Sequence, residues 1–202
     1  WIRSYLAACE VQKICPETQV ISVGDREADI YELFVESKQQ IDGADLLIRS
    51  IRTRYRKTET GDLWESMAED PIAGYRDILI PPKGNRPERI ARVSVRFSNV
   101  ELRPPQSKKD LPIIPIWAVY VREEEPPQNE EPIEWMLLTT VKTDTVEQAY
   151  RIVELYAKRW GVEVFHRTLK SGCNVEKRRF QDIDRLKNSL AIDLVIAWRI
   201  YY

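Results

Sequence analysis

The spacing of apolar residues over the first 51 positions predicts a helix, a strand, a second helix and a second strand. Residues 1–13 carry apolar side chains at helical spacing. The side chains expected to form the apolar side of this helix are Ile2, Leu6, Ala7 and Val11. Residues 20–24 form a nearly all-apolar run, typical of a strand buried on both faces, and residues 45–51 form the second strand. A helix is expected between them from Asp25 onward, so the order predicts a parallel strand pair.

Residues 52–142 have a different sequence pattern, with short apolar runs separated by charged or proline-rich segments that are expected to be loops. Eleven of the twelve prolines lie in this stretch. Its strand-like runs are Tyr75–Ile80, Ile90–Phe97, Ile113–Val121 and Trp135–Thr140. The helical pattern returns at residues 145–170 and again from about residue 183 to the end. The pattern therefore predicts an α/β fold in which residues 1–51 and 143–202 form a core and residues 52–142 form a β-rich insertion.

Composition narrows the class of protein. Hydrophobic residues make up 43% of the chain and charged residues 31%, which suits a folded core with a strongly solvated surface. Three cysteines without metal-ligand spacing indicate reduced thiols in a cytoplasmic protein. A net charge of −1 argues against a dedicated nucleic-acid arm. The charge is uneven, however, because residues 158–179 hold seven Lys or Arg against two Glu.

Four polar residues near the C-terminus share a helical spacing: Tyr156, Arg159, Glu163 and Lys170. At about 100° per residue on one continuous helix, they point within an arc of roughly 60°. A hydroxyl, two cations and a carboxylate on one stripe favour contact with phosphates and a metal ion. The alternatives are an i,i+4 ion pair between Arg159 and Glu163, and a tyrosine at the edge of an apolar layer.

Asp25 is the first charged residue after the apolar run 20–24. In open α/β sheets, chemistry gathers at the carboxyl ends of the strands, which makes this aspartate a candidate metal ligand. The alternative is a helix cap, since an aspartate there satisfies free backbone N–H groups. A strand-end aspartate and a helix glutamate, Glu163, would together supply the carboxylate oxygens that Mg²⁺ prefers.

A second basic run follows the strand at residues 45–51 and begins at Arg49. Alternation along an extended segment is expected to place Arg52, Arg54 and Arg56 on one face. A DNA-contacting segment and a solvated loop are both compatible with this pattern.

Trp135 and His166 are the remaining candidates. Trp135 begins the last strand-like run after a proline-rich loop, where it either packs in the core or stacks on an unpaired base. His166, the lone histidine, lies three residues after Glu163, a spacing that permits a shared ligand set. A role in hydrogen bonding on the phosphate side is the favoured interpretation of His166.

The spacing of Tyr156, Arg159, Glu163 and Lys170 resembles the Y-R-E-K signature of cut-and-paste DDE transposases from bacterial insertion sequences, the insertion-sequence-four group. The upstream run 22–30, which contains Asp25, resembles the segment that carries the second catalytic aspartate of that family. The likeness covers most of the chain.

The resemblance implies a ribonuclease-H-like core with a β-rich insertion, in which Asp25 and Glu163 are catalytic ligands of Mg²⁺ or Mn²⁺. The residues that it implies as DNA contacts are Tyr156, Arg159, Lys170, Trp135 and Arg49. The implied activity is cleavage of transposon ends and joining of the 3′-OH to target DNA, by a homodimer in a synaptic complex. The implied location is the bacterial cytoplasm, at the nucleoid when DNA is bound.

The first catalytic aspartate of the family is expected before Trp1, on leading strands that this chain lacks. The chain is therefore expected to be a catalytic-core fragment that is inactive in DNA cleavage alone. An unpaired strand edge at residues 20–24 predicts poor stability or self-association.

Two other functions fit the sequence. One is a non-catalytic DNA-binding remnant or regulator that competes for transposon ends. The other is a ribonuclease-H-like nuclease that acts without strand transfer.

Overall fold

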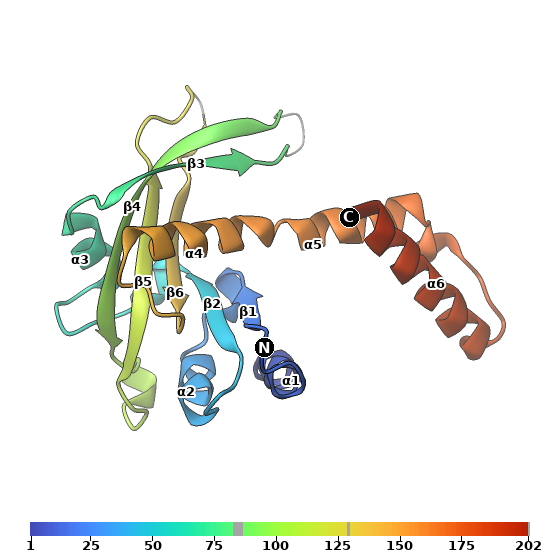
Figure 1. Ribbon diagram of the computed structural model, residues 1–202, viewed down its shortest axis with the longest axis horizontal. Coiled ribbons are helices and arrows are strands. Elements are labelled where there is room, and N and C mark those ends of the chain that lie inside the picture. The colour runs from blue at the N-terminus through green and yellow to red at the C-terminus, as the bar shows by residue number, and fades with distance from the viewer. Residues whose placement is uncertain (83–86, 129, 202) are drawn as a thin grey trace. The chain divides into compact units, whose positions relative to one another are not determined.

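The chain forms two compact units, Trp1–Ala157 and Lys158–Tyr202. The computed structural model describes residues 1–82, 87–128 and 130–201 (Figure 1). Within these ranges, no helix is long and apolar enough to cross a membrane.

The first unit is built on a mixed sheet (Figure 1). Its described strands are β1 (Ile21–Gly24), β2 (Asp45–Ser50), β3 (Gly74–Ile80), β4 (Arg89–Leu102), β5 (Ile114–Glu123) and β6 (Glu134–Thr139). They lie in the order β1-β2-β6-β5-β4-β3. β1 and β2 run parallel, as predicted, and every other neighbouring pair is antiparallel.

Apolar side chains cover both faces of this sheet, because successive residues of a strand point to opposite sides. Leu46 and Ile48 of β2 belong to one buried cluster, whereas Leu47 belongs to the other. The first cluster also holds residues of α1 (Ile2–Ile14), α2 (Tyr31–Gln39) and α3 (Leu63–Glu69). The second holds the apolar stripe of α4 (Val146–Lys158), which consists of Ala149, Ile152, Val153 and Tyr156. The first unit is therefore an α/β domain with helices packed on each face of its sheet.

The four strand-like runs of residues 52–142 are confirmed as β3, β4, β5 and β6. They continue the same sheet as β1 and β2, with β6 pairing directly with β2. α3 was not expected from the apolar pattern. The division of the chain at residues 51 and 142 stays a prediction.

Two expectations about burial are wrong. In α1, Leu6 and Val11 are exposed, and the buried side chains are Tyr5 and Cys9. Tyr5 packs in the first buried cluster, and its hydroxyl is satisfied there by donating a hydrogen bond to the Ala44 carbonyl at 2.9 Å. β1 is only partly buried, because it lies at one edge of the described sheet with β2 as its neighbour.

The second unit consists of helical segments. α5 (Gly161–Arg167) continues into a π-helical turn, Thr168–Gly172, and α6 (Ile183–Tyr201) follows. Arg178 ties the connecting segment to α6 by donating to the buried Asp193 carboxylate at 2.9 Å. The predicted continuous helix over residues 145–170 is wrong, because α4 ends at Lys158 and α5 begins at Gly161. The final residue of the chain, which the sequence pattern placed in a helix, lies outside the described residues.

Candidate functional site

Three of the predicted site residues lie at the same end of the sheet, where β1 and β2 end and β6 begins. β1 and β2 are parallel and pair Gly24 with Ile48, so Asp25 and Arg49 both lie at their carboxyl ends. β6 runs the other way and begins at this end with Glu134 and Trp135. This end of the sheet therefore carries the carboxylate of Asp25, the guanidinium of Arg49 and the indole of Trp135.

Asp25 is held in a tight turn directly after β1. Its Oδ1 accepts a hydrogen bond from the Glu27 amide at 3.0 Å, so the side chain caps the short 3-10 turn Arg26–Ala28. The turn folds back closely on the strand: a Cβ added at Gly24 would lie 2.5 Å from the Ala28 Cβ and 2.8 Å from Ile48 Cδ1. Glycine at position 24 thus allows the approach that fixes where Asp25 sits.

A buried ion pair between Asp29 and Arg56 secures the same turn. The side chain of Asp29 is 0% exposed and that of Arg56 is 5% exposed. Arg56 donates to Asp29 Oδ1 from Nη2 at 2.6 Å and from Nε at 3.0 Å. The Ser50 hydroxyl and the Ile51 amide donate to Asp29 Oδ2 at 2.9 Å and 3.0 Å. The Arg56 guanidinium also lies 5.6 Å from the centre of the Tyr31 ring. The pair therefore joins the segment after β1 to the segment after β2.

The expectation that Arg52, Arg54 and Arg56 share one face is wrong. Residues 52–54 form a 3-10 turn, and Tyr55 adopts a left-handed conformation with φ 46°. The chain therefore leaves the extended path, so that Arg56 turns into the core while Arg52 and Arg54 stay exposed.

Glu134 contacts two basic residues, Arg49 and Arg52, at this end of the sheet. Its backbone carbonyl accepts a hydrogen bond from Arg49 Nη2 at 3.1 Å, and its Oε2 lies 3.3 Å from Arg52 Nη1. Its Oε1 accepts a hydrogen bond from the Tyr120 hydroxyl at 2.6 Å. Burial and this hydrogen bond to the carboxylate raise the pKa of Tyr120 to about 12. Tyr120 therefore remains a donor at neutral pH and holds the Glu134 carboxylate in place.

Trp135 and Tyr156 pack against each other. Their ring centres lie 5.0 Å apart at an interplanar angle of 68°, an edge-to-face arrangement. Tyr156 is 4% exposed on the apolar stripe of α4. The structure thus brings together two residues that the sequence placed in different motifs, and it places both in the packing of the second cluster.

The other predicted site residues lie in the second unit. Arg159 Nη2 donates to Glu163 Oε1 at 2.9 Å, the ion pair considered as the alternative from the sequence. Lys170 lies on the π-helical turn, and its Nζ is 3.1 Å from Glu176 Oε1. His166 is exposed on α5. Because the helix is interrupted at residues 159–160, the stripe of four residues is not carried by one continuous helix.

Sequence reasoning missed Asp29 and Glu134 as residues that shape this site, and it placed Arg56 in a basic run rather than in the core. Asp29 carried one signal, since it is a charged residue beside apolar ones, four positions after Asp25. A charged residue is rarely fully buried without a partner, but the partner was not apparent from the sequence.

The carboxylates offer the oxygen donors that a hard divalent cation prefers. Within the described ranges, however, no three His, Cys, Asp or Glu side chains form a group that could hold a metal ion.

The family model described as a transposase DDE domain matches residues 34–198, which is most of the chain. The matched range includes Glu163 and all the residues predicted to contact DNA. It begins after Asp25.

Proposed function

Because the chain belongs to the family of transposase DDE domains, we propose that it is the catalytic-core part of a transposase that cleaves transposon ends and joins the 3′-OH to target DNA, and that it is inactive in cleavage alone. The observation that carries this proposal is the match over residues 34–198. Membership implies DNA as a partner, and the family typically uses divalent metals. The α/β architecture is compatible with the proposed ribonuclease-H-like core, and a homodimer in a synaptic complex is part of the proposal.

Asp25 and Glu163 are the proposed ligands of Mg²⁺ or Mn²⁺. Both offer carboxylate oxygens, and Asp25 lies at the carboxyl end of a parallel strand pair, where α/β proteins bind ligands. When bound, such an ion supplies activation of water and stabilisation of the oxygens that attack and leave phosphorus. Because the family match begins after Asp25, its assignment rests on the sequence resemblance and on this position.

The ion pair of Glu163 does not prevent metal binding. The side chain of Glu163 is 42% exposed and that of Arg159 is 22% exposed. An exposed i,i+4 pair contributes only about 0.3–0.5 kcal/mol, so exchanging Arg159 for a divalent cation costs little.

Six residues are the proposed DNA contacts. They are Arg49, Trp135, Tyr156, Arg159, His166 and Lys170. The cations neutralise phosphates and position the DNA backbone. Trp135 is proposed to stack on an unpaired base, which requires its indole to exchange some contact with the Tyr156 ring.

Iron-directed cleavage tests the metal ligands without relying on catalysis. Fe²⁺ takes the place of Mg²⁺, and with peroxide and ascorbate it cuts the backbone near the residues that bind it. We expect cuts close to residues 25 and 163 that excess Mg²⁺ suppresses. Glu163→Gln should lose the cut near residue 163. The matched control Glu147→Gln, an exposed carboxylate on α4, should keep it. Cuts that are unchanged in Glu163→Gln, or indifferent to Mg²⁺, would reject the metal assignment.

The DNA products separate this function from the two alternatives. The protein that carries this chain is incubated with Mg²⁺ and a labelled duplex copied from the DNA flanking its coding sequence. Nicks followed by joined products support the transposase. Nicks without joined products favour a nuclease. End-specific binding without nicks, unchanged by Glu163→Ala, favours a regulator, for which the capping role of Asp25 and the Arg159 pair of Glu163 would suffice.

A further inference from the structure

A solvent-open cavity of about 700 Å³ lies between two loops of the first unit. One wall is the segment 54–61, and the other is the segment 103–109 that follows β4. Its charged lining residues are Arg54, Arg56, Lys57, Glu59, Arg103 and Lys109. Arg56 itself turns into the core, so four cations and one carboxylate line a space large enough for a ligand.

Most of this positive charge is not neutralised by the protein. Among the described residues, no carboxylate oxygen lies within 4.0 Å of the charged nitrogens of Arg54, Arg103 or Lys109. Lys57 has a long contact of 3.7 Å with Asp62 and a side chain that is 60% exposed. Only Arg56 is fully engaged, by Asp29.

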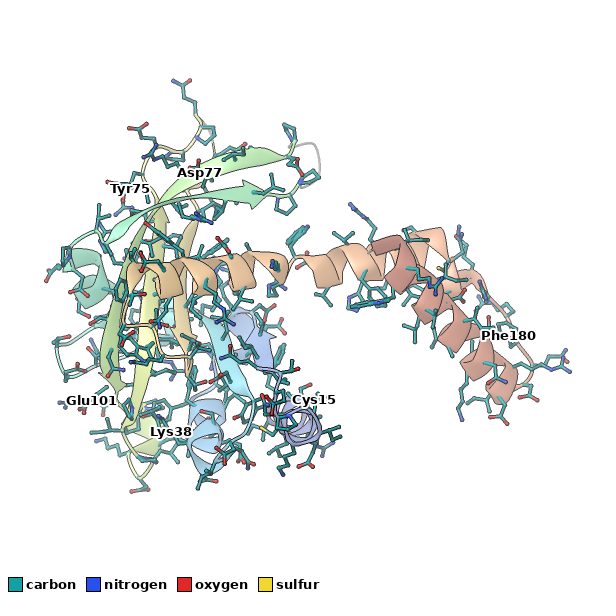
Figure 2. The ribbon with its side chains drawn as sticks, viewed as in Figure 1. Cys15, Lys38, Tyr75, Asp77, Glu101 and Phe180 are labelled. Atoms are coloured by element: carbon teal, nitrogen blue, oxygen red, sulfur yellow. The ribbon has the colours of Figure 1, made fainter. Side chains whose placement is uncertain are left out.

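The single carboxylate of the lining is held by the protein backbone. Glu59 Oε2 accepts a hydrogen bond from the Glu101 amide at 2.8 Å. Glu101 lies near the end of β4, whereas Tyr75 and Asp77 of β3 lie toward the other end of the sheet (Figure 2). The bond comes from a neutral amide and leaves the charge of Glu59 in place, but the cations of the lining outnumber this one carboxylate, so the net charge open to a ligand is positive.

Backbone hydrogen bonds fix both walls of the cavity. The Arg103 amide donates to the Lys57 carbonyl at 2.8 Å, which joins the two segments directly. The Thr58 amide donates to the Gly61 carbonyl at 2.8 Å, which closes the first loop. The cations are therefore presented by an ordered frame, which lowers the entropy lost on binding.

Tyr55 adds an aromatic surface at the rim. It is held in the left-handed conformation between Arg54 and the buried Arg56, and 72% of it is exposed. An exposed tyrosine beside cations is the combination that nucleic-acid surfaces use for stacking and for phosphate contact.

The wall of the cavity at residues 103–109 is far from the strand end that carries Trp135. Arg103 directly follows the pair Leu102–Ile114, whereas Trp135 pairs with Val121, seven residues further along β5. At about 3.4 Å per residue this is roughly 24 Å along the sheet. This wall of the cavity is thus distant from Trp135, whereas the other wall is joined to the turn that holds Asp25 through the Arg56–Asp29 pair.

We propose that this cavity is an additional DNA-binding site that holds backbone phosphates of a DNA segment extending beyond the candidate catalytic residues. Arg54, Arg103 and Lys109 contact the phosphates, and Tyr55 packs on the adjacent sugar or base. The assignment of DNA as the ligand rests on the proposed transposase function. It also fits a site that is open, formed by two loops and lined by cations spread across both.

A charge-matched pair of triple variants tests the proposal. The pocket variant is Arg54→Gln/Arg103→Gln/Lys109→Gln, and the control is Arg3→Gln/Lys38→Gln/Arg92→Gln. The control residues are exposed and lie outside the cavity, so both variants lose three positive charges. Fluorescence anisotropy with a labelled duplex of about 40 base pairs is measured between about 50 and 200 mM salt.

We expect the pocket variant to raise the dissociation constant about tenfold and to reduce the salt slope by about 2–3. The control should stay within about twofold of the unmodified chain. Equal weakening of both variants, or none in either, would overturn the proposal. If the unmodified chain binds DNA and only the pocket prediction fails, the proposed function stands. If it binds no duplex even at low salt, both fail.

Lysine acetylation followed by mass spectrometry tests the unmodified chain, so that misfolding of a variant is not a concern. DNA should protect Lys57 and Lys109 while Lys38 on α2 remains reactive. Equal acetylation of Lys109 with and without DNA would overturn the proposal.

Discussion

Two arginine–carboxylate pairs, one in each unit, have the same chemistry and opposite settings. Arg56 and Asp29 are 5% and 0% exposed and are surrounded by further hydrogen bonds. Arg159 and Glu163 are 22% and 42% exposed and lie one helical turn apart. The first pair is fixed within the core, whereas the second is partly exposed to solvent.

The difference indicates how the two pairs divide their roles. Breaking a buried pair leaves an unpaired charge in the core at a high free-energy cost. Asp29 and Arg56 therefore stay paired and hold the turn that positions Asp25. A partly exposed pair gives up little on opening, so the pair with Arg159 is no obstacle to the metal binding proposed for Glu163. A residue with a role in binding is therefore better sought in the pair that opens easily.

The largest effect is expected from Asp29→Ala. It leaves the Arg56 guanidinium buried without its carboxylate and should lower the free energy of unfolding by about 3–5 kcal/mol, measured by urea denaturation. The matched control is Asp77→Ala on β3, an exposed aspartate labelled in Figure 2, which should change stability by less than about 0.5 kcal/mol. Similar losses in the two variants would mean that the buried pair does not hold the fold.

Arg89 and Glu123 form a second largely buried ion pair, whose contribution to stability is expected to depend on pH. Its Oε2 accepts hydrogen bonds from Arg89 Nη2 at 2.9 Å and from the Ile133 amide at 3.0 Å. Burial raises the pKa of Glu123, but the Arg89 and Ile133 hydrogen bonds and the Arg89 charge lower it more, so the pKa lies below its ordinary value.

A lowered pKa stabilises the fold above the unfolded-state pKa, and this contribution is lost as the pH falls through the folded-state pKa. Glu123→Gln should therefore cost about 1–3 kcal/mol at neutral pH and less in acid. Urea denaturation at a series of pH values measures the difference between the two proteins. A difference that does not change on acidification would contradict the role assigned to the Glu123 carboxylate.

A double-mutant cycle measures how firmly Trp135 is engaged in packing. Trp135→Leu, Tyr156→Leu and the double variant should give a coupling energy of about 0.5–1.5 kcal/mol in unfolding experiments, as expected for an edge-to-face aromatic pair. A coupling near zero would show that the contact contributes nothing to stability, leaving Trp135 available to DNA without loss.

The smallest stability effect is expected for the exposed pair. Arg159→Gln and Glu163→Gln should each change the free energy of unfolding by only about 0.3–0.5 kcal/mol. The same denaturation assay applies. If either variant lost several kcal/mol of unfolding free energy, this pair would be as important for stability as the Asp29–Arg56 pair, and the contrast between the two pairs would be wrong.

The sequence predicted the strands well because β2, β5 and β6 are buried on both faces and form continuous apolar runs. It failed for α1, where the buried side chains are Tyr5 and Cys9 rather than the aliphatic residues. It also missed the interruption of the helix between Lys158 and Gly161. A single glycine in a long helical pattern is only a weak indication of such a break.

The candidate site was only partly predictable. Short motifs identified Asp25, Glu163 and Trp135 as candidates, because each lies at a recognisable spacing or strand end. The Asp29–Arg56 pair spans 27 residues and depends on the segments after β1 and β2 lying side by side, so no local pattern could reveal it. The contact between Trp135 and Tyr156 likewise depends on α4 packing against the sheet.

The most direct test of the account is the affinity of the chain for Mn²⁺, measured by calorimetry for the unmodified chain, Glu163→Gln and the control Glu147→Gln. Glu163→Gln should weaken Mn²⁺ binding about tenfold or more, a change of at least about 1.4 kcal/mol, while its fold stability is nearly unchanged. Glu147→Gln should bind like the unmodified chain. Equal Mn²⁺ affinity in all three proteins would contradict the central claim that Glu163 is a metal ligand.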